Sequence, residues 1–204
     1  RMGIDIWEVI EAASTKPFGF QPFYPGPGLG GHCIPIDPFY LTWKAKEFGI
    51  NTRFIELAGE INTAMPEYVM GRIRLACDRI GKPLKGTGVL VRGIAYKQNI
   101  GDQRESPALE ILEQLRSAGA RIAYNDPYCV TCEGHRHYPN LRLASQPLTE
   151  QLFRDHPVVV LTTDHDVFDY PTIHRLVSAA GGVIVDTRHA FASRGIRSDR
   201  VIGA

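Results

Sequence analysis

The sequence predicts an α/β protein in which a helical region with one long helix precedes a doubly wound, Rossmann-like parallel sheet. Two observations predict this class. Apolar residues recur at helical spacing through the first 81 residues, which is typical of amphipathic helices. From residue 82 onward, short apolar runs alternate with helix-like segments, and such alternation favours a parallel sheet. We therefore expect two domains, over residues 1–81 and 82–204.

The helical region opens with Asp5 and Glu8 at capping-box spacing, which should start the first helix. Four apolar residues then fall on one face of it: Ile6, Val9, Ile10 and Ala13. A second helix is expected near residues 40–48 and a long one over 53–80, about 42 Å in length. Pro66 should kink the long helix or begin a new segment. An apolar helix of this length suggests burial against a second copy of the chain, or against a further domain.

The second region should contain four strands, at residues 88–94, 121–124, 158–161 and 182–185. Ser106 is expected to cap the helix after the first strand, with Pro107 at its first position and Gly119 at its end. Further helices are expected near residues 149–153 and 172–180. In doubly wound sheets ligands lie beyond the carboxyl ends of the strands, so the residues that follow each strand are the informative ones.

Two cationic side chains follow strands of this predicted sheet. Lys97 lies in the connection after the first strand, which is long for a strand-to-helix loop, and Arg188 follows the last strand. A guanidinium fork and an ammonium point charge could together hold a pyrophosphate. The alternative is that both are solvated loop charges near helix ends.

The segment of residues 25–37 carries a cysteine shortly after four glycines, which are Gly26, Gly28, Gly30 and Gly31. Glycines let a backbone approach a ligand closely, so Cys33 is expected in a loop suited to ligand contact. Its thiolate could attack a carbonyl carbon, and Asp37 is spaced to orient a base or a water beside it. The alternative is a glycine-rich turn with an incidental small residue, because a single cysteine is a weak signal for a nucleophile.

The same glycines match the dinucleotide-binding pattern G-x-G-x-x-G. That pattern must follow a strand and open a helix. Here prolines lie on both sides, at Pro25 and Pro35, and we expect neither element. The segment is therefore not predicted to be a dinucleotide fingerprint.

A possible metal motif occurs at Cys129, Cys132, His135 and His137. Two thiols and two imidazoles can form a tetrahedral zinc site. The second gap is too short for a zinc finger, so we expect a polar surface loop and no metal.

Composition excludes several functional classes. The chain of 204 residues is 44% hydrophobic and 22% charged, with a formal net charge of +1. A net charge this small does not indicate a basic surface for binding nucleic acid, and no apolar run reaches the length of a membrane span. Four cysteines are too few for a secreted disulfide framework, so we expect reduced thiols and a cytoplasmic protein.

Five motifs resemble the UDP-glucose/GDP-mannose dehydrogenase family and lie at residues 16–46, 93–97, 102–107, 124–127 and 185–188. The run Pro-Phe-Tyr-Pro-Gly-Pro-Gly-Leu-Gly-Gly-His-Cys within the first of them looks most like the UDP-N-acetylglucosamine 6-dehydrogenase branch. In this family a nucleotide-cofactor domain comes first, and the resemblance implies that the chain is a C-terminal fragment lacking this NAD-binding domain. The long apolar helix, rather than the resemblance, is the reason that we expect a homodimer through this helix.

The resemblance implies an activity and a set of site residues. The family oxidises the C6 alcohol of a UDP-sugar twice with NAD, in polysaccharide precursor synthesis. Cys33 would be the nucleophile that forms a thiohemiacetal and then a thioester, and Asp37 would position the hydrolytic water or its base. Substrate contacts are implied for Tyr24, Gly26, Gly28, Gly30, Gly31, Tyr96, Lys97 and Arg188. Cofactor contacts are implied for Cys33, Ile34, Pro35, Ile36 and Arg104.

Two alternatives remain open. The substrate could be UDP-glucose, UDP-N-acetylgalactosamine or UDP-N-acetylmannosamine rather than UDP-N-acetylglucosamine, because part of the acetamido pocket depends on residues outside the chain. The chain could instead be a non-catalytic module that binds a nucleotide diphosphate. In either case we expect the 204 residues alone to be catalytically inactive.

Overall fold

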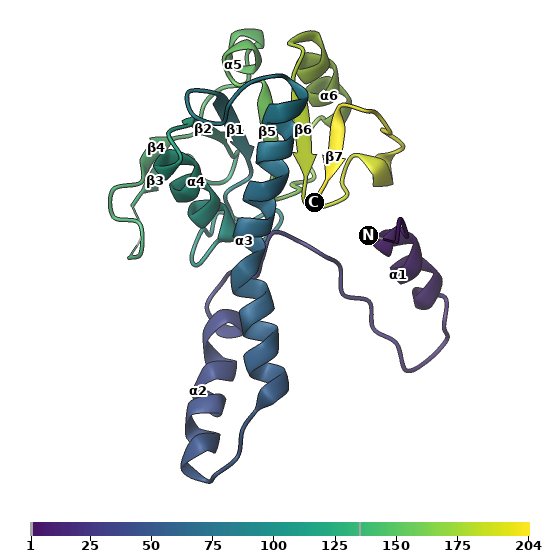
Figure 1. Ribbon diagram of the computed structural model, residues 1–204, viewed down its shortest axis with the longest axis vertical. Coiled ribbons are helices and arrows are strands. Elements are labelled where there is room, and N and C mark those ends of the chain that lie inside the picture. Colours follow the sequence, from purple (N-terminus) through teal and green to yellow (C-terminus); the bar gives the residue numbers. More distant parts are fainter. Residues whose placement is uncertain (1, 135) are drawn as a thin grey trace.

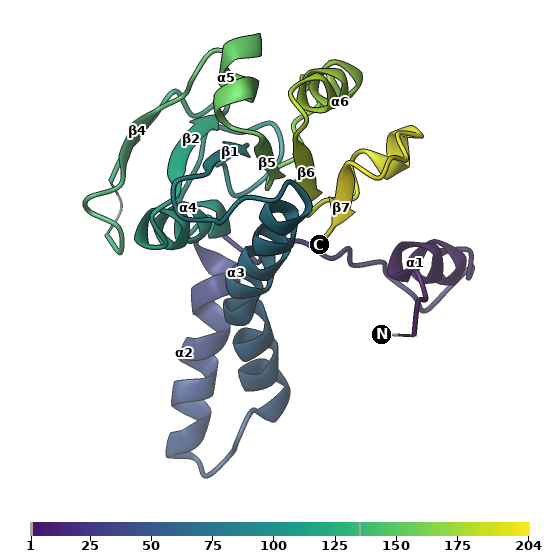
Figure 2. The ribbon, with the colours of Figure 1, turned by 45° about the horizontal axis from the view of Figure 1, so that its top comes forward.

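The computed structural model describes residues 2–134 and 136–204. Its first part is helical, with α1 (Ile6–Ser14), α2 (Cys33–Glu47) and α3 (Arg53–Arg79). Figure 1 shows α2 and α3 side by side as an arm that projects from an α/β domain. The turned view in Figure 2 shows α1 apart from this arm, at the end of an extended segment. No helix among the described residues is long and apolar enough to cross a membrane.

The α/β domain is built on a five-stranded sheet in the order β2-β1-β5-β6-β7, in which every neighbouring pair is parallel. The strands are β1 (Gly88–Arg92), β2 (Arg121–Asn125), β5 (Val158–Leu161), β6 (Val183–Asp186) and β7 (Val201–Gly203). The helices of this domain are α4 (Pro107–Ser117), α5 (Glu150–Asp155) and α6 (Tyr170–Ala179), and a 3-10 turn spans Ala192–Arg194. The predicted parallel sheet is confirmed.

Two apolar clusters cover the two faces of the sheet. Residues of α3 and α4 pack on one face, and residues of α5 and α6 pack on the other. Side chains along β1 alternate between the clusters, since Val89 and Val91 join the first and Leu90 joins the second. Because both faces are covered, the inner strands β5 and β6 are almost wholly apolar, with the sequences Val-Val-Val-Leu and Val-Ile-Val-Asp. The sheet is therefore doubly wound, as the sequence predicts.

The long helix α3 has two different halves. Its second half contributes Val69, Met70 and Ile73 to the core of the α/β domain, whereas Phe54 in its first half is 90% exposed. The helix continues through Pro66 without a break. The second half thus packs mainly on the α/β domain of the chain itself, whereas the first half presents an uncovered apolar face.

The start of α2 differs from the sequence prediction. This helix begins at Cys33 rather than near residue 40, so Cys33 is the first residue of a helix and not part of a loop. Pro35 lies in its first turn, where a missing N–H costs no intrahelical hydrogen bond. The glycine-rich segment therefore does open a helix, contrary to expectation. The residues before it are not a strand, so the dinucleotide fingerprint remains unsupported.

A small hairpin lies where a polar surface loop was expected. It consists of β3 (Thr131–Glu133) and β4 (Arg142–Ala144), paired antiparallel. Cys132 of β3 and the nearby Cys129 are buried in the core, and burial raises the pKa of Cys129 to about 12. The expectation of a polar surface loop is therefore wrong for these cysteines. No group of three metal-ligating side chains occurs among residues 2–134 and 136–204, and His135 lies outside the described residues.

Candidate functional site

The candidate site lies where the order in which the chain adds strands to the sheet reverses. The chain leaves β1 toward β2 and later returns to β5 on the other side of β1. Connections diverge at such a point, which leaves a crevice beyond the carboxyl ends of the two strands. A pocket of about 330 Å³ occupies this place. Its lining comes from the glycine-rich segment, the β1–α4 connection, the β5–α6 connection and the residue two positions after β6.

The glycine-rich segment packs directly on the β1–α4 connection. The N–H of Gly31 donates to the carbonyl oxygen of Arg104 at 2.9 Å. A Cβ at Gly30 would lie 2.6 Å from the Tyr96 Cβ, and one at Gly26 would lie 2.5 Å from a guanidinium nitrogen of Arg188. At Gly30 the close neighbours include the backbone of Glu105 and Ser106, which cannot move aside easily, whereas at Gly26 the neighbour is the flexible end of the Arg188 side chain. Gly30 is thus required by close packing against the protein itself, a reason different from the ligand approach that the sequence suggests.

Lys97 and Arg188 line the same pocket, although 91 positions separate them in the sequence. Arg188 is oriented by its Nε, which donates to Asp164 Oδ1 at 2.9 Å. Its two terminal nitrogens make no hydrogen bond with the described residues, and Lys97 has no carboxylate within ion-pair distance among them. Two cationic groups therefore converge on one cavity with donors to spare, as binding of a diphosphate requires.

Asp164 is the residue that the sequence analysis left out of this site. It lines the pocket and forms the ion pair with Arg188, in which the two side chains are 21% and 33% exposed. Its position three residues after β5 is the signal that could have identified it, since ligand-contacting residues follow strands in this fold. Asp164 fixes the guanidinium in place and also offsets part of its charge.

Cys33 lies next to this pocket on an exposed helix start. The neighbouring Ile34 lines the pocket, and Cys33 is the one free cysteine of the described chain that is exposed. Asp37 follows at four residues, so both side chains share one face of α2. Neither Cys33 nor Asp37 lines the pocket itself. The arrangement places an accessible thiol beside a cationic cavity.

Arg104 belongs to the β1–α4 connection and interacts electrostatically with Cys33. Its guanidinium donates to both carboxylate oxygens of Asp102, at 2.6–3.0 Å, and this carboxylate raises the pKa of Arg104, with smaller contributions from Tyr96 and Cys33. The Arg104 side chain is 64% exposed. An exposed, oriented cation thus lies within electrostatic reach of the thiol.

Tyr24 does not reach the pocket but takes part in an aromatic stack. The Trp7 ring stacks on both Tyr24, at 5.7 Å between ring centroids, and His189, at 4.6 Å, and the ring planes are nearly parallel in each pair. The stack connects α1 to the residues that follow β6. Trp7 and His189 are not among the residues predicted from the sequence to bind a ligand, because their contacts join positions too distant in sequence for a local pattern to reveal them.

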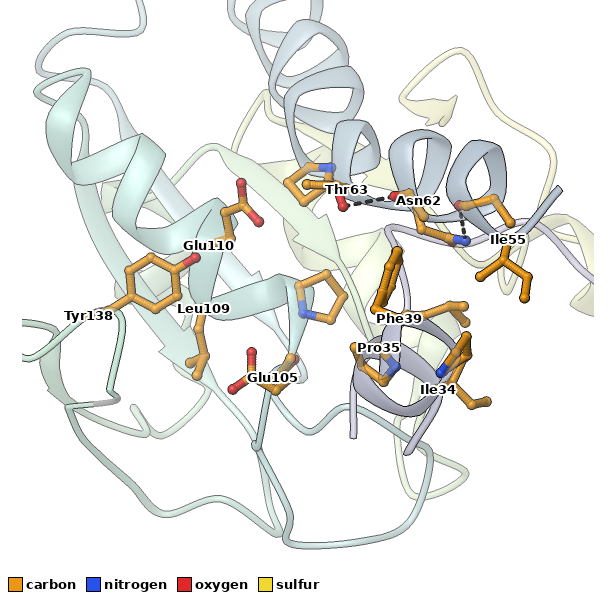
Figure 3. Close-up of a pocket in the computed structure, with 18 of the residues that line it drawn as sticks. Ile34, Pro35, Phe39, Ile55, Asn62, Thr63, Glu105, Leu109, Glu110 and Tyr138 are labelled. Atoms are coloured by element: carbon orange, nitrogen blue, oxygen red, sulfur yellow. Dashed lines mark hydrogen bonds between the residues drawn. The ribbon is translucent and has the colours of Figure 1, made fainter. Parts of the chain in front are cut away.

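A second and larger cavity of about 470 Å³ adjoins the first and is mainly apolar. Figure 3 shows Ile34, Pro35 and Phe39 of α2 facing Ile55, Asn62 and Thr63 of α3, with Glu105, Glu110 and Tyr138 at the other end. The charged groups in its lining are these two carboxylates, which repel phosphate. Charge therefore favours the smaller pocket as the anion site, although the apolar groove is larger.

The fold and the pocket define a Rossmann-like α/β protein with a cationic ligand site at the switch point of its sheet. Comparison with protein families gives the particular family. Residues 1–64 match the model for the UDP-glucose/GDP-mannose dehydrogenase family, central domain, and residues 90–193 match that for the UDP binding domain of the same family. The chain belongs to the UDP-glucose/GDP-mannose dehydrogenase family.

Individual relatives agree with this assignment. The chain is 32% identical over 96% of its length to an NDP-N-acetyl-D-galactosaminuronic acid dehydrogenase of Ralstonia nicotianae, and covers 43% of that protein. It is 36% identical over 67% of its length to a UDP-N-acetyl-D-glucosamine 6-dehydrogenase of Pseudomonas aeruginosa, and covers 32% of it. A solved UDP-D-ManNAc dehydrogenase from Pyrococcus horikoshii superposes on 98% of the chain with a TM-score of 0.76 and 25% identity, and 44% of that structure is covered. The chain thus spans less than half the length of these relatives.

Proposed function

We propose that this chain is the substrate-binding and thiol-bearing part of an NAD-dependent nucleotide-sugar 6-dehydrogenase. The observation that supports it most is the convergence of Lys97 and Arg188 on one pocket beside the exposed Cys33. Two cations suit the diphosphate of a nucleotide sugar, and a thiol suits covalent capture of a carbonyl carbon. Membership of the family agrees with both features.

The proposed chemistry assigns a covalent role to Cys33. The Cys33 thiolate adds to the C6 aldehyde of the half-oxidised sugar and forms a thiohemiacetal. Loss of a second hydride from C6 converts this adduct to a thioester, which water cleaves to the carboxylate and the free thiol. Asp37, on the same face of α2, is proposed to orient that water. Covalent capture keeps the aldehyde from leaving between the two oxidations.

NAD, when bound, would supply the hydride acceptor for each oxidation. The chain offers side chains suited to one edge of such a site. Arg104 is an exposed cation that fits a pyrophosphate, and Ile34, Pro35 and Ile36 form the first turn of α2 beside Cys33. We propose that these residues face a cofactor domain, which would complete the site.

For the substrate, we propose a UDP-N-acetylhexosamine, with UDP-N-acetylglucosamine as the first candidate. The relatives cited above carry names that refer to N-acetylated sugars, and the Pseudomonas aeruginosa protein, at 36% identity, is named for UDP-N-acetyl-D-glucosamine. UDP-glucose is the alternative substrate. Turnover of UDP-N-acetylglucosamine, UDP-N-acetylgalactosamine, UDP-N-acetylmannosamine and UDP-glucose by the complete enzyme decides among them.

We also propose that the arm formed by α2 and α3 is buried against a second copy of the chain. Its outer surface exposes large apolar side chains, including Trp43 at 64%, Phe54 at 90% and Ile61 at 56%. Light scattering should then give twice the chain mass, and Phe54→Asp should shift the protein toward the monomer. A wild type that stays monomeric at high concentration would contradict this proposal.

The test of the binding site is a calorimetric titration of UDP into the chain. Arg188→Ala should weaken binding by about 1.5–3 kcal/mol, the range for hydrogen bonds to charged groups, and added salt should weaken the wild type as well. Arg200→Ala is the matched control, because Arg200 contacts the carbonyl oxygens of Gly181 and Gly182 at the opposite edge of the sheet. Equal affinities of wild type and Arg188→Ala would place the nucleotide elsewhere.

The test of the covalent role uses the complete enzyme with Cys33→Ser and Cys33→Ala. The serine variant should stop releasing acid and accumulate an ester-linked sugar, because an alkoxide is a poorer leaving group than a thiolate. The alanine variant should form no adduct. Normal production of two NADH per sugar by Cys33→Ser would remove Cys33 from the mechanism and favour a non-catalytic binding module.

A further inference from the structure

The segment that carries Lys97 depends on its neighbours for its position. Lys97 lies in the β1–α4 connection, lines the cationic pocket and is exposed. The backbone at residue 97 sets where the flexible Lys97 side chain starts and therefore which region its ammonium can reach. What fixes this backbone therefore keeps the ammonium within reach of the pocket.

Asp126 anchors the segment on the side that precedes Lys97. Its Oδ2 accepts hydrogen bonds from the N–H groups of Ile94, at 2.7 Å, and Ala95, at 3.1 Å, and its Oδ1 accepts two more backbone N–H groups. A fifth donor is the His165 ring at 3.1 Å. Five donors around one buried carboxyl group require the ionised form, and Asp126 is only 1% exposed.

His165 extends this anchor to the side that follows Lys97. Its Nδ1 lies 2.9 Å from the backbone N–H of Asn99, which can only donate, so this nitrogen carries no proton. Its Nε2 must then donate to the ionised Asp126, and the imidazole is neutral with a known tautomer. The ring is fully buried between Tyr128, at 4.9 Å between centroids, and Phe168, at 5.1 Å.

Asp166 holds the same side of the segment from the surface. Its carboxylate accepts the side-chain amides of Gln98 at 2.5 Å and Asn99 at 2.6 Å, and its own N–H donates back to Asn99 Oδ1 at 3.0 Å. Asn99 has a φ of 60°, a conformation that asparagine tolerates better than most residues. Two connections from opposite sides of the switch point are therefore joined at residues 98–99.

We propose that Asp126, His165 and Asp166 are positioning residues for the nucleotide diphosphate. They fix residues 94–95 and 98–99 on either side of Lys97, with the neutral His165 ring as the bridge between the two fixed points. None of them lines the pocket, so they act only through the segment they hold. This inference rests on the proposed function of the pocket as a diphosphate site.

The experiment compares His165→Leu, which loses both ring hydrogen bonds, with His165→Gln, whose amide can accept from Asn99 and donate to Asp126. Asp166→Ala removes the surface contacts without disturbing the core, so it remains informative if His165→Leu unfolds. Asp169→Ala is the matched control, because Asp169 caps α6 in the same connection and does not touch the Lys97 segment. The readouts are UDP affinity and hydrogen exchange of residues 93–103, measured at equal folded fraction.

His165→Leu and Asp166→Ala should accelerate exchange in this peptide and weaken UDP binding on the order of tenfold, as expected if about one molecule in ten keeps the competent segment. The UDP affinity of His165→Gln should stay within about twofold of that of the wild type. Unchanged exchange and affinity in His165→Leu and Asp166→Ala, or a His165→Gln variant as impaired as leucine, would overturn the proposal. A wild type that does not bind UDP would refute the proposed function instead, and the exchange data would then still decide whether these residues hold the segment in place.

Discussion

Arg92 is a buried cation, and its replacement by methionine should leave the free energy of unfolding almost unchanged. It ends strand β1 at 2% exposure, with its guanidinium carbon 3.9 Å from the ring centroid of Phe168. One terminal nitrogen donates to Asn125 Oδ1, whereas Nε has no hydrogen-bond partner among the described residues. Burial lowers the pKa of Arg92 to about 10. We expect Arg92→Met, which keeps the length and volume of the stem, to leave stability nearly unchanged.

The expected magnitude follows from three opposing contributions. The lowered pKa of Arg92 corresponds to about 3 kcal/mol against the charged form. The contact with the Phe168 ring offsets about 2 kcal/mol of this, and the hydrogen bond to Asn125 about 1 kcal/mol. Arg92→Met removes all three, so its free energy of unfolding should stay within about 1 kcal/mol of the wild type. Arg92→Lys keeps a buried charge but loses the planar contact, and it should cost about 2–4 kcal/mol.

Equilibrium denaturation in urea at pH 7 measures both variants, with Arg121→Met, on an exposed position of β2, as the control. The comparison between methionine and lysine is the decisive one, because both lose the guanidinium and only lysine keeps the charge. If methionine destabilises the protein by more than about 2 kcal/mol, or as much as lysine does, the guanidinium is a net stabilising group and the reasoning is wrong.

Three further predictions concern the pocket and its supports. Asp164→Asn should tighten UDP binding by up to about fivefold in calorimetry, because the substitution frees Arg188 from an ion pair worth about 0.2–1 kcal/mol. Weaker binding would mean that Asp164 is needed mainly to orient the guanidinium. Burial alone would raise the pKa of Asp126, but the His165 and backbone hydrogen bonds outweigh it and lower the pKa to about 2. Its stabilising contribution of about 2 kcal/mol is therefore complete above pH ~4 and lost as the pH falls toward 2, so acid titration of the wild type should show a loss in this window that Asp126→Asn lacks. Gly30→Ala should lower the free energy of unfolding by about 1–3 kcal/mol through overpacking. It should also speed hydrogen exchange of the Gly31 amide, and an unchanged exchange rate would show that the segment can move aside.

The sequence predicts the sheet well because its signals are local. Each of the four predicted strands contains three or more consecutive apolar residues, and the helix after β1 has its cap at Ser106 as expected. The strands missed by the sequence analysis, β3, β4 and β7, have three residues each, which is too short for a period of two to be recognised. The start of α2 was missed because proline was interpreted as a helix breaker, whereas it is compatible with a first turn.

The candidate site is predicted only in part, for a related reason. Residues that follow strands can be found from the fold class alone, and this rule identifies Lys97 and Arg188. The contacts that orient them join distant segments, such as Asp164 with Arg188 or Asn99 with His165. No local pattern contains such pairs. The same limit applies to the glycines, whose pattern suggests close approach but does not say whether a ligand or the protein is the neighbour.

The packing of the glycine-rich segment has a consequence for the proposed chemistry. Gly30 lies against Tyr96, and Gly31 is bonded to the backbone of Arg104, so the turn that leads into Cys33 rests on the connection that carries Lys97. The two proposed ends of the substrate, the diphosphate and the reacting C6 carbon, are then positioned by one structural element. A change that shifts this connection should therefore alter both nucleotide affinity and the chemistry at the thiol. A substitution in the exposed half of α3, by contrast, should alter neither unless it acts through a partner copy.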